Sequence, residues 1–284
     1  MKVKGISVII PSINRHQIIG KTIKTYFKAL EYCGLPYEII VIDDGSTPPY
    51  ELKDVKVIRQ SFSKGVCKAN NLGLSKARYS HFWTCDDDMN ANLDIFEKLS
   101  REEEWTKDIA AIGSTVPTIN SMNLISFPRN GLRITVDGYI IDVTEVIVNE
   151  DTYLDVDFLK SGSLISKKVL KEIGGWDTQY KSGYRAETDL FLKMRYLEYR
   201  LLINPSSALF HYQYKTGGVR KVPIDIIDEF NLNQSSMEAK YFFNKWKGVS
   251  FLGKNTMIAY LRKEPILGKY NCSLVESLSL VKII

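Results

Sequence analysis

Short apolar runs alternate with amphipathic stretches along the first half of the chain. The apolar runs end at turn-forming residues, as is typical of buried strands. They predict strands at residues 6–10, 37–42, 55–58, 81–84 and 109–112. Between the runs, apolar residues recur at helical spacings, which predicts helices through residues 19–30, 65–77 and 93–105. This alternation predicts an α/β fold with a mostly parallel central sheet and helices on both faces.

The second half follows the pattern less regularly. Residues 117–150 contain Asp137-Gly138 between apolar runs, which is a hairpin signal, and we interpret them as an insertion. After them we expect strands at residues 156–165, 201–203 and 208–211, a short helix ending at the double glycine 174–175, and an amphipathic helix at 188–199. Beyond about residue 216 the pattern becomes helical and basic.

Acidic residues follow two of the predicted strands. Asp43 and Asp44 end the second strand, and Asp86, Asp87 and Asp88 follow the fourth. Ligands of parallel α/β sheets bind outside the carboxyl ends of the strands, so both acidic turns should face one crevice. Turn chemistry alone is a sufficient alternative for one or two aspartates. Three in succession repel one another, and a divalent cation such as Mg²⁺ or Mn²⁺ relieves that repulsion most simply.

Composition and charge narrow the picture further. The 284 residues are 44% hydrophobic and 25% charged, as in ordinary soluble proteins. No apolar run approaches bilayer length, and the four cysteines show no CxxC or metal-binding spacing, so we expect a cytoplasmic protein. Residues 232–284 carry 8 basic and 3 acidic residues, a balance of +5 that equals the net charge of the whole chain. The neutral main body argues against nucleic acid as a partner.

Several motifs together resemble the family 2 glycosyltransferases of the GT-A fold. In chain order they read SVIIPSINR, VIDDGST, KGVCKANNLGLSKA, CDDDM at the DXD position, SGSLISKKVL, GGWD, AETDLFLKMR and ALFHY. Each motif alone is weak, but their shared order over residues 5–215 makes the resemblance strong. It implies a Rossmann-like GT-A domain at 1–215, divided into a nucleotide-sugar half (1–115), an insertion (116–152) and an acceptor half (153–215), with a basic helical extension at 216–284.

The resemblance implies an inverting transfer from a nucleoside diphosphate sugar, with UDP- or dTDP-sugars favoured over GDP-sugars, to a hydroxyl of a glycan or lipid-linked acceptor. Mn²⁺ or Mg²⁺ would neutralise the leaving diphosphate and would be held by Asp86, Asp88 and His211. A structural role stays open for the histidine. The expected nucleotide-sugar contacts are Pro11, Ser12, Arg15, Asp44, Lys64, Asp86 and Asp87, with Asp44 accepting from a uracil or thymine ring N–H. Plain surface positions stay open for Arg15 and Lys64.

Inversion also requires a general base. The resemblance assigns this role to Glu187, with Asp189 second, although Ala186 stands where the family has the first acid of a pair. A structural role in the first turn of the helix stays open for both acids. Trp176 and Asp177 are expected to contact sugar, and a place in the core is the alternative for Trp176.

Two other functions stand as alternatives. A sugar-phosphate nucleotidyltransferase would need a glycine-rich loop after the first strand, and PSINRHQIIG offers none. A non-catalytic nucleotide-sugar or glycan-binding module would not need Glu187 together with the acidic triplet.

The basic tail interleaves aromatic and basic residues. This pattern suits peripheral contact with an anionic membrane, and the alternative is packing onto the catalytic domain. Packing is favoured for residues 242–246, because this stretch ends in a Lys-Trp pair and a similar segment often follows the core domain in this family.

Overall fold

The computed structural model describes residues 2–119, 125–126, 132–134, 140–142, 151–156, 159–183, 185–212 and 229–246. Its helices are α1 (His16–Cys33), α2 (Val66–Lys76), α3 (Ile95–Leu99), the 3₁₀ turn η1 (Glu102–Glu104), α4 (Lys167–Glu172), α5 (Ala186–Tyr196) and α6 (Glu229–Trp246). Its strands are β1 (Ile6–Ser12), β2 (Tyr37–Asp43), β3 (Lys56–Arg59), β4 (His81–Thr84), β5 (Met89–Ala91), β6 (Ile109–Thr115), β7 (Thr118–Ile119), β8 (Ile125–Ser126), β9 (Leu132–Ile134), β10 (Ile140–Asp142), β11 (Leu154–Val156), β12 (Ser163–Ser166) and β13 (Arg200–Tyr212). None of the helices in these ranges is long and apolar enough to cross a membrane.

One large sheet organises the fold, and its main path runs β3-β2-β1-β4-β12-β6-β13-β7-β8. β3, β2, β1 and β4 are mutually parallel, as the sequence pattern predicts. β12 lies antiparallel between β4 and β6, and β13 runs parallel to β6. The carboxyl ends of β1, β2 and β4 therefore share one edge, where Ser12 is paired in register with Asp43.

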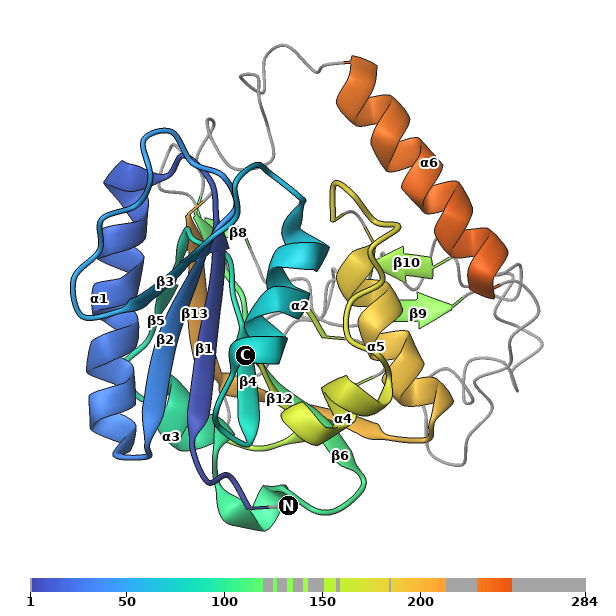
Figure 1. Ribbon diagram of the computed structural model, residues 1–284. Coiled ribbons are helices and arrows are strands. Elements are labelled where there is room, and N and C mark those ends of the chain that lie inside the picture. The colour runs from blue at the N-terminus through green and yellow to red at the C-terminus, as the bar shows by residue number, and fades with distance from the viewer. Residues whose placement is uncertain are drawn as a thin grey trace.

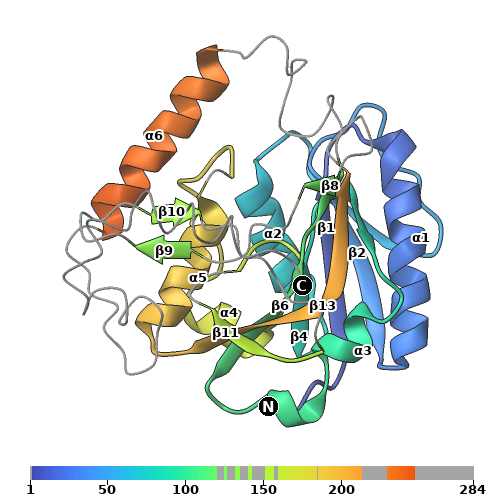
Figure 2. The same cartoon turned by 180° about the vertical axis from the view of Figure 1, so that it is seen from behind.

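Helices cover both faces of this sheet, so the fold is the expected α/β arrangement (Figures 1 and 2). On one face, α1 and α3 bury Ile19, Tyr26 and Phe96 against strand residues such as Trp83. On the other face, α2, α4 and α5 pack on the sheet through a second apolar cluster that includes Phe191. Alternate residues of β1 and β2 enter the two clusters, because successive side chains of a strand point to opposite faces.

Helix α2 approaches β1 closely at Gly73. A Cβ at this position would come within 2.3 Å of Ile9 Cγ2, whereas a Cβ at Gly20 in α1 would meet nothing within 4 Å. We expect Gly73→Ala to lower the free energy of unfolding by about 1–3 kcal/mol through overpacking. Gly20→Ala should raise it by up to about 1 kcal/mol, since alanine favours the helix. Urea denaturation of both variants tests this pair, and shifts of the same sign would contradict the close approach.

Two predicted elements of the first two thirds of the chain are wrong in extent. The helix predicted at 93–105 is only α3 followed by η1, because Trp105 turns inward and its indole N–H donates to the carbonyl oxygen of Leu99 at 2.8 Å. The strand predicted at 156–165 is two strands with different neighbours, since β11 pairs with β13 and β12 inserts between β4 and β6. The turn predicted at Asp137-Gly138 lies outside the described residues, but the strands on either side of it, β9 and β10, pair antiparallel as the predicted hairpin requires.

The strands predicted at 201–203 and 208–211 are one strand, β13. Its register against β6 shifts between Asn204 and Ala208. The Asn204 side-chain oxygen accepts hydrogen bonds from the backbone N–H groups of Ser206 and Ser207, at 3.0 and 3.2 Å. This local bonding bends the strand without ending it, so β13 carries on to the site.

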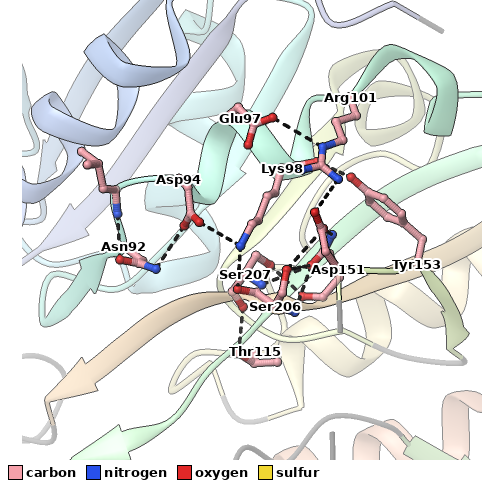
Figure 3. A network of polar contacts seen from close by, with 12 residues as sticks. Asn92, Asp94, Glu97, Lys98, Arg101, Thr115, Asp151, Tyr153, Ser206 and Ser207 are labelled. Atoms are coloured by element: carbon pink, nitrogen blue, oxygen red, sulfur yellow. Dashed lines mark hydrogen bonds and ion pairs between the residues drawn. The ribbon is translucent and has the colours of Figure 1, made fainter. Parts of the chain in front are cut away.

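A polar network holds the segment that begins at residue 151 against α3 and β13 (Figure 3). Asp151 accepts from the Asn204 amide at 2.9 Å and pairs with Arg101 at 2.8 Å. Lys98 in α3 pairs with Asp94 at 2.8 Å and donates to the carbonyl oxygen of Ser206 at 3.1 Å. The network ties α3, the segment that begins at residue 151 and the bend of β13 into one unit.

Candidate active site

The acidic triplet follows β4 directly, at the sheet edge where the parallel strands end. After it, the chain enters β5, which pairs antiparallel with β13 and sets Met89 opposite His211. The backbone N–H of Tyr212 donates to the carbonyl oxygen of Asp88 at 2.9 Å. This pairing brings an imidazole from the end of β13 to the carboxylates that follow β4.

Asp86, Asp88 and His211 form a group that can hold a metal ion. Each offers one ligand atom, and these atoms lie within 4.8 Å of one another. The Nε2 atom of His211 is 3.3 Å from a carboxylate oxygen of Asp88. Carboxylate oxygens suit Mg²⁺ and Mn²⁺, and a neutral imidazole is a further good ligand for Mn²⁺. The three residues expected to bind metal are therefore brought together, and their donor set fits such an ion.

Negative charge is concentrated around this group. Burial raises the pKa of Asp86 to about 7, and repulsion from Glu187 and Asp88 adds to the rise, against the opposing effect of His211. Like charges held close in a site of low dielectric favour the protonated form. A bound divalent cation would remove this repulsion, as the sequence argument for the triplet requires.

Asp87 is turned toward the end of β1 and away from the candidate metal group. Its carboxylate accepts a hydrogen bond from the Ser12 hydroxyl at 2.5 Å, and its backbone carbonyl accepts one from Thr22 at 2.7 Å. The Tyr50 hydroxyl lies 2.7 Å from the Ser12 hydroxyl and accepts from the backbone N–H of Arg15 at 2.7 Å. Burial raises the pKa of Asp87 to about 6, against the lowering effects of Ser12 and Arg15.

Arg15 is buried beside the triplet, with 9% of its residue surface exposed. Its Nε atom is 3.9 Å from Asp87 and its Nη1 atom is 3.7 Å from Asp88, and neither nitrogen has a hydrogen-bond partner in the structure. A solvated arginine, the open alternative, is therefore wrong. Buried N–H groups of a guanidinium are costly to leave unbonded, and they are suited to bind oxygen atoms of a carboxylate or phosphate.

Asp44 organises the loop that follows β3. Its two carboxylate oxygens accept hydrogen bonds from four donors at 2.7–3.0 Å: the side chains of Gln60 and Ser63 and the backbone N–H groups of Lys64 and Gly65. A carboxylate has about four lone-pair sites, so the four donors of this loop occupy the hydrogen-bond acceptor sites of Asp44. Contact of Asp44 with a nucleotide base stays a prediction. Lys64 is exposed on the same loop, and Pro11 is half-buried at the end of β1.

Glu187 lies in the first turn of α5 and faces the triplet. Its carboxylate accepts a hydrogen bond from the Ser161 hydroxyl at 2.5 Å. Burial raises its pKa, against the lowering effects of Ser161, Lys160 and His211. Among charged neighbours, Glu187 has the largest effect on the pKa of Asp86. A carboxylate with raised proton affinity therefore stands beside the candidate metal group, where sequence analysis expected the base.

Two other residues expected in the site do not fit their assigned roles. Trp176 is 3% exposed and packs against Phe82 with ring centroids 5.3 Å apart, so its side chain belongs to the core and cannot stack on a sugar. Asp189 is fully buried, and its oxygens accept from Tyr180, Lys245 and Trp246 at 3.2, 2.8–3.0 and 2.9 Å. A carboxylate satisfied in this way is a structural anchor and not a general base.

Asp177 also contacts α6. Its carboxylate accepts from the Tyr241 hydroxyl at 2.8 Å and from the Lys245 ammonium at 2.6 Å. A contact with sugar stays a prediction for this residue.

Several residues that shape the site were not predicted from the sequence. Tyr50 supports Ser12 and Arg15, Thr22 holds the backbone of the triplet, and Ser161 orients Glu187. Ser161 opens the motif SGSLIS, which is the one available signal. Tyr50 and Thr22 lie in a loop and a helix with no pattern that points to the site, so only the fold brings them there.

Comparison with known proteins matches the part of the chain that carries the acidic triplet. Residues 7–174 match the family described as Glycosyl transferase family 2. The chain is 35% identical over 94 residues to a chondroitin synthase of Pasteurella multocida, and the match covers 30% of this chain and 10% of the relative. It is 34% identical over 117 residues to a dolichol-phosphate mannosyltransferase of Pyrococcus furiosus, covering 38% of this chain and 32% of the relative. The chain thus matches a tenth and about a third of these two relatives' lengths.

The fold is also shared with solved structures. The crystal structure of GalNAc-T7 with UDP, GalNAc and Mn²⁺ aligns with a TM-score of 0.62 at 18% identity, covering 98% of this chain and 57% of that one. The sheet of this chain and the helices on both of its faces thus have the GT-A fold. Because the family match spans more than half of the sequence, the chain belongs to glycosyl transferase family 2.

Proposed function

We propose that this protein transfers a sugar from a nucleoside diphosphate sugar to an acceptor hydroxyl, with inversion at the anomeric carbon. The observation that carries the proposal is the convergence of a metal-ligating group and a carboxylate of raised pKa at one sheet edge. Inversion needs a cation that counters the charge of the leaving diphosphate and a base for the hydroxyl, and the proposal assigns the ligands of the first and the carboxylate of the second to this edge.

Asp86, Asp88 and His211 would hold the cation, Mn²⁺ or Mg²⁺. When bound, the ion supplies positive charge that stabilises the leaving diphosphate. The chain's own contribution is to fix three ligands from two elements, the exit of β4 and the end of β13. The relative solved with UDP and Mn²⁺ supports a divalent metal at such a site.

Glu187 would act as the general base. Its carboxylate takes the proton of the acceptor hydroxyl while that oxygen bonds to the anomeric carbon and the bond to the diphosphate breaks on the opposite face. The raised pKa makes the carboxylate a better proton acceptor than an exposed glutamate, and the hydrogen bond from Ser161 fixes its orientation. Proton NMR of the first-formed product tests inversion: we expect the anomeric configuration opposite to that of the donor, and retention would contradict it.

Arg15, with its unbonded buried nitrogens, would bind the diphosphate. We expect Arg15→Met to raise the Kd for UDP at least about tenfold, because a hydrogen bond to a charged group contributes about 1.5–3 kcal/mol. The same variant should bind Mn²⁺ at least as tightly as the unmodified protein, since a cation next to Asp87 and Asp88 is removed. Titration calorimetry with each ligand measures both effects.

Arg101→Met is a matched control for that experiment. Arg101 also pairs with carboxylates, those of Glu97 and Asp151, but it lies in the network of α3 and β13. Unchanged UDP affinity in Arg15→Met, or an equal loss in Arg101→Met, would remove Arg15 from the donor site.

The donor and acceptor are proposed at the level of class. Pro11 and Ser12 at the end of β1, and Asp87, which is bonded to Ser12, would contact the nucleoside. Asp44, directly after β2, and Lys64, in the loop after β3, would lie next to it, and UDP- or dTDP-sugars are the favoured donors. The acceptor is a glycan or a lipid-linked acceptor, in line with the names of the two relatives. Cytoplasmic location, the domain division at residue 215 and membrane contact of the tail stay predictions. The tail beyond residue 246 lies outside the described residues.

A further inference from the structure

Helix α6 presents one face to the acceptor half of the protein. Glu238, Tyr241, Phe242, Lys245 and Trp246 recur at helical spacings of three and four, which places them on one side of the helix. Phe242 and Glu238 are buried, at 0% and 2% exposed. Figures 1 and 2 show α6 beside α5, the helix that carries Glu187 in its first turn. The packing that sequence analysis favoured for residues 242–246 is therefore confirmed for Phe242, Lys245 and Trp246.

A lysine of α6 joins two carboxylates that flank the approach to α5. The Lys245 ammonium is 2.6 Å from Asp177 and 2.8 Å from Asp189. Burial lowers the pKa of Lys245, but hydrogen bonds to Asp177 and Asp189 outweigh this effect and raise it overall. Asp189 is fully buried and lies two positions after Glu187 in the same helical turn. The ammonium thus neutralises charge directly behind the proposed base.

The loop at residues 177–183, which leads to α5, is held from both sides. On the α6 side, Glu238 accepts from the backbone N–H and the hydroxyl of Ser182 at 2.7 and 2.6 Å, and Tyr180 packs edge-on against Tyr241. On the α2 side, the loop lies so close that a Cβ at Gly65 would come within 2.8 Å of the Lys181 carbonyl oxygen. The loop therefore has little freedom while α6 is docked.

We propose that α6 is a positioning element for catalysis, in which Lys245 fixes the loop at 177–183 and the first turn of α5 so that Glu187 meets the acceptor hydroxyl. This inference rests on the proposed role of Glu187. Lys245 contacts Asp177 and Asp189, and Trp246 contacts Asp189, so their effect passes through these two carboxylates. Misplacing a catalytic group by about 1 Å can reduce turnover about 10²-fold, so a remote anchor of this kind has a measurable effect.

The test compares three variants of the full chain. Lys245→Met removes the ammonium, Lys245→Arg keeps a positive charge, and Lys98→Met is the matched control. Lys98 also joins a helix to its neighbours through a carboxylate and a carbonyl, but it does so in α3. We expect Lys245→Met to lower kcat for sugar transfer at least about tenfold while the Kd for UDP changes less than about twofold. Lys245→Arg should restore most of the turnover, and Lys98→Met should keep kcat.

Hydrogen exchange separates this inference from the proposed function. Backbone amides of residues 177–190 should exchange faster in Lys245→Met than in the unmodified protein, and not in Lys98→Met. If the loop loosens but Glu187→Gln is fully active, α6 still orders the loop and the role of Glu187 is wrong. If Lys245→Met only lowers the melting temperature, with kcat unchanged, or if kcat and UDP affinity fall together, α6 is a structural cover and the positioning role is overturned.

Discussion

We expect Asp88→Ala to abolish sugar transfer and Asp86→Ala to reduce it severely. Asp88 belongs to the candidate metal group, and its carboxylate oxygens lie 3.3 Å from His211 Nε2 and 3.7 Å from Arg15 Nη1. Without its carboxylate, the charge that develops on the leaving diphosphate loses its counter-ion. We expect at least about a 10³-fold loss of kcat, because metal-assisted stabilisation is worth several kcal/mol and each 1.36 kcal/mol is a factor of ten.

Asp94→Ala is the control for that loss. Asp94 pairs with Lys98 in the network of α3, outside the candidate metal group, and its replacement should leave kcat near that of the unmodified protein. Binding of Mn²⁺, followed by titration calorimetry in the absence of substrate, should weaken in Asp88→Ala and not in Asp94→Ala. Tight Mn²⁺ binding and normal turnover by Asp88→Ala would show that the metal, if any, is held elsewhere.

Glu187→Gln should keep donor binding while reducing kcat at least about 10²-fold, the usual scale for a lost general base. Glutamine has the shape of glutamate and its amide oxygen can still accept from Ser161, so the change removes the proton acceptor with little other effect. Glu172→Gln at the end of α4 is the control, because Glu172 also accepts a hydrogen bond, from Tyr199, but outside the site. A mild effect of Glu187→Gln combined with a large effect of Asp189→Asn would reverse the assignment of the base.

The strands that build the site could be predicted because they are buried on both faces. Each of β1, β2 and β6 contains a run of consecutive buried apolar residues, and a run of that kind needs no knowledge of its neighbours to be recognised. The bend of β13 could not be predicted in the same way. Its Asn-Pro-Ser-Ser segment has the composition of a loop, and hydrogen bonds that form only in the folded chain, among them those of Asn204, hold it in the strand.

The candidate site was predictable where the residues that form it are adjacent in the sequence. The triplet at 86–88 stands together in the sequence, so its repulsion is visible without a structure. The structural role of Asp189 could not be predicted, because its partner Lys245 lies 56 residues further along the chain. Trp176 was ambiguous for a related reason: a tryptophan after two glycines suits either a sugar platform or a core position, and only its contact with Phe82 decides.

The most direct test of a metal-dependent sugar transferase is release of nucleoside diphosphate from a panel of UDP-, dTDP- and GDP-sugars. Each donor is incubated with the full-length protein and a mixture of glycan and lipid-linked acceptors, in Mn²⁺, in Mg²⁺ and in excess EDTA. The expected result is acceptor-dependent release from a UDP- or dTDP-sugar that requires one of the two metals and disappears in EDTA. Full release in EDTA would contradict the metal role assigned to Asp86, Asp88 and His211, and no release from any donor would contradict the proposed transfer itself.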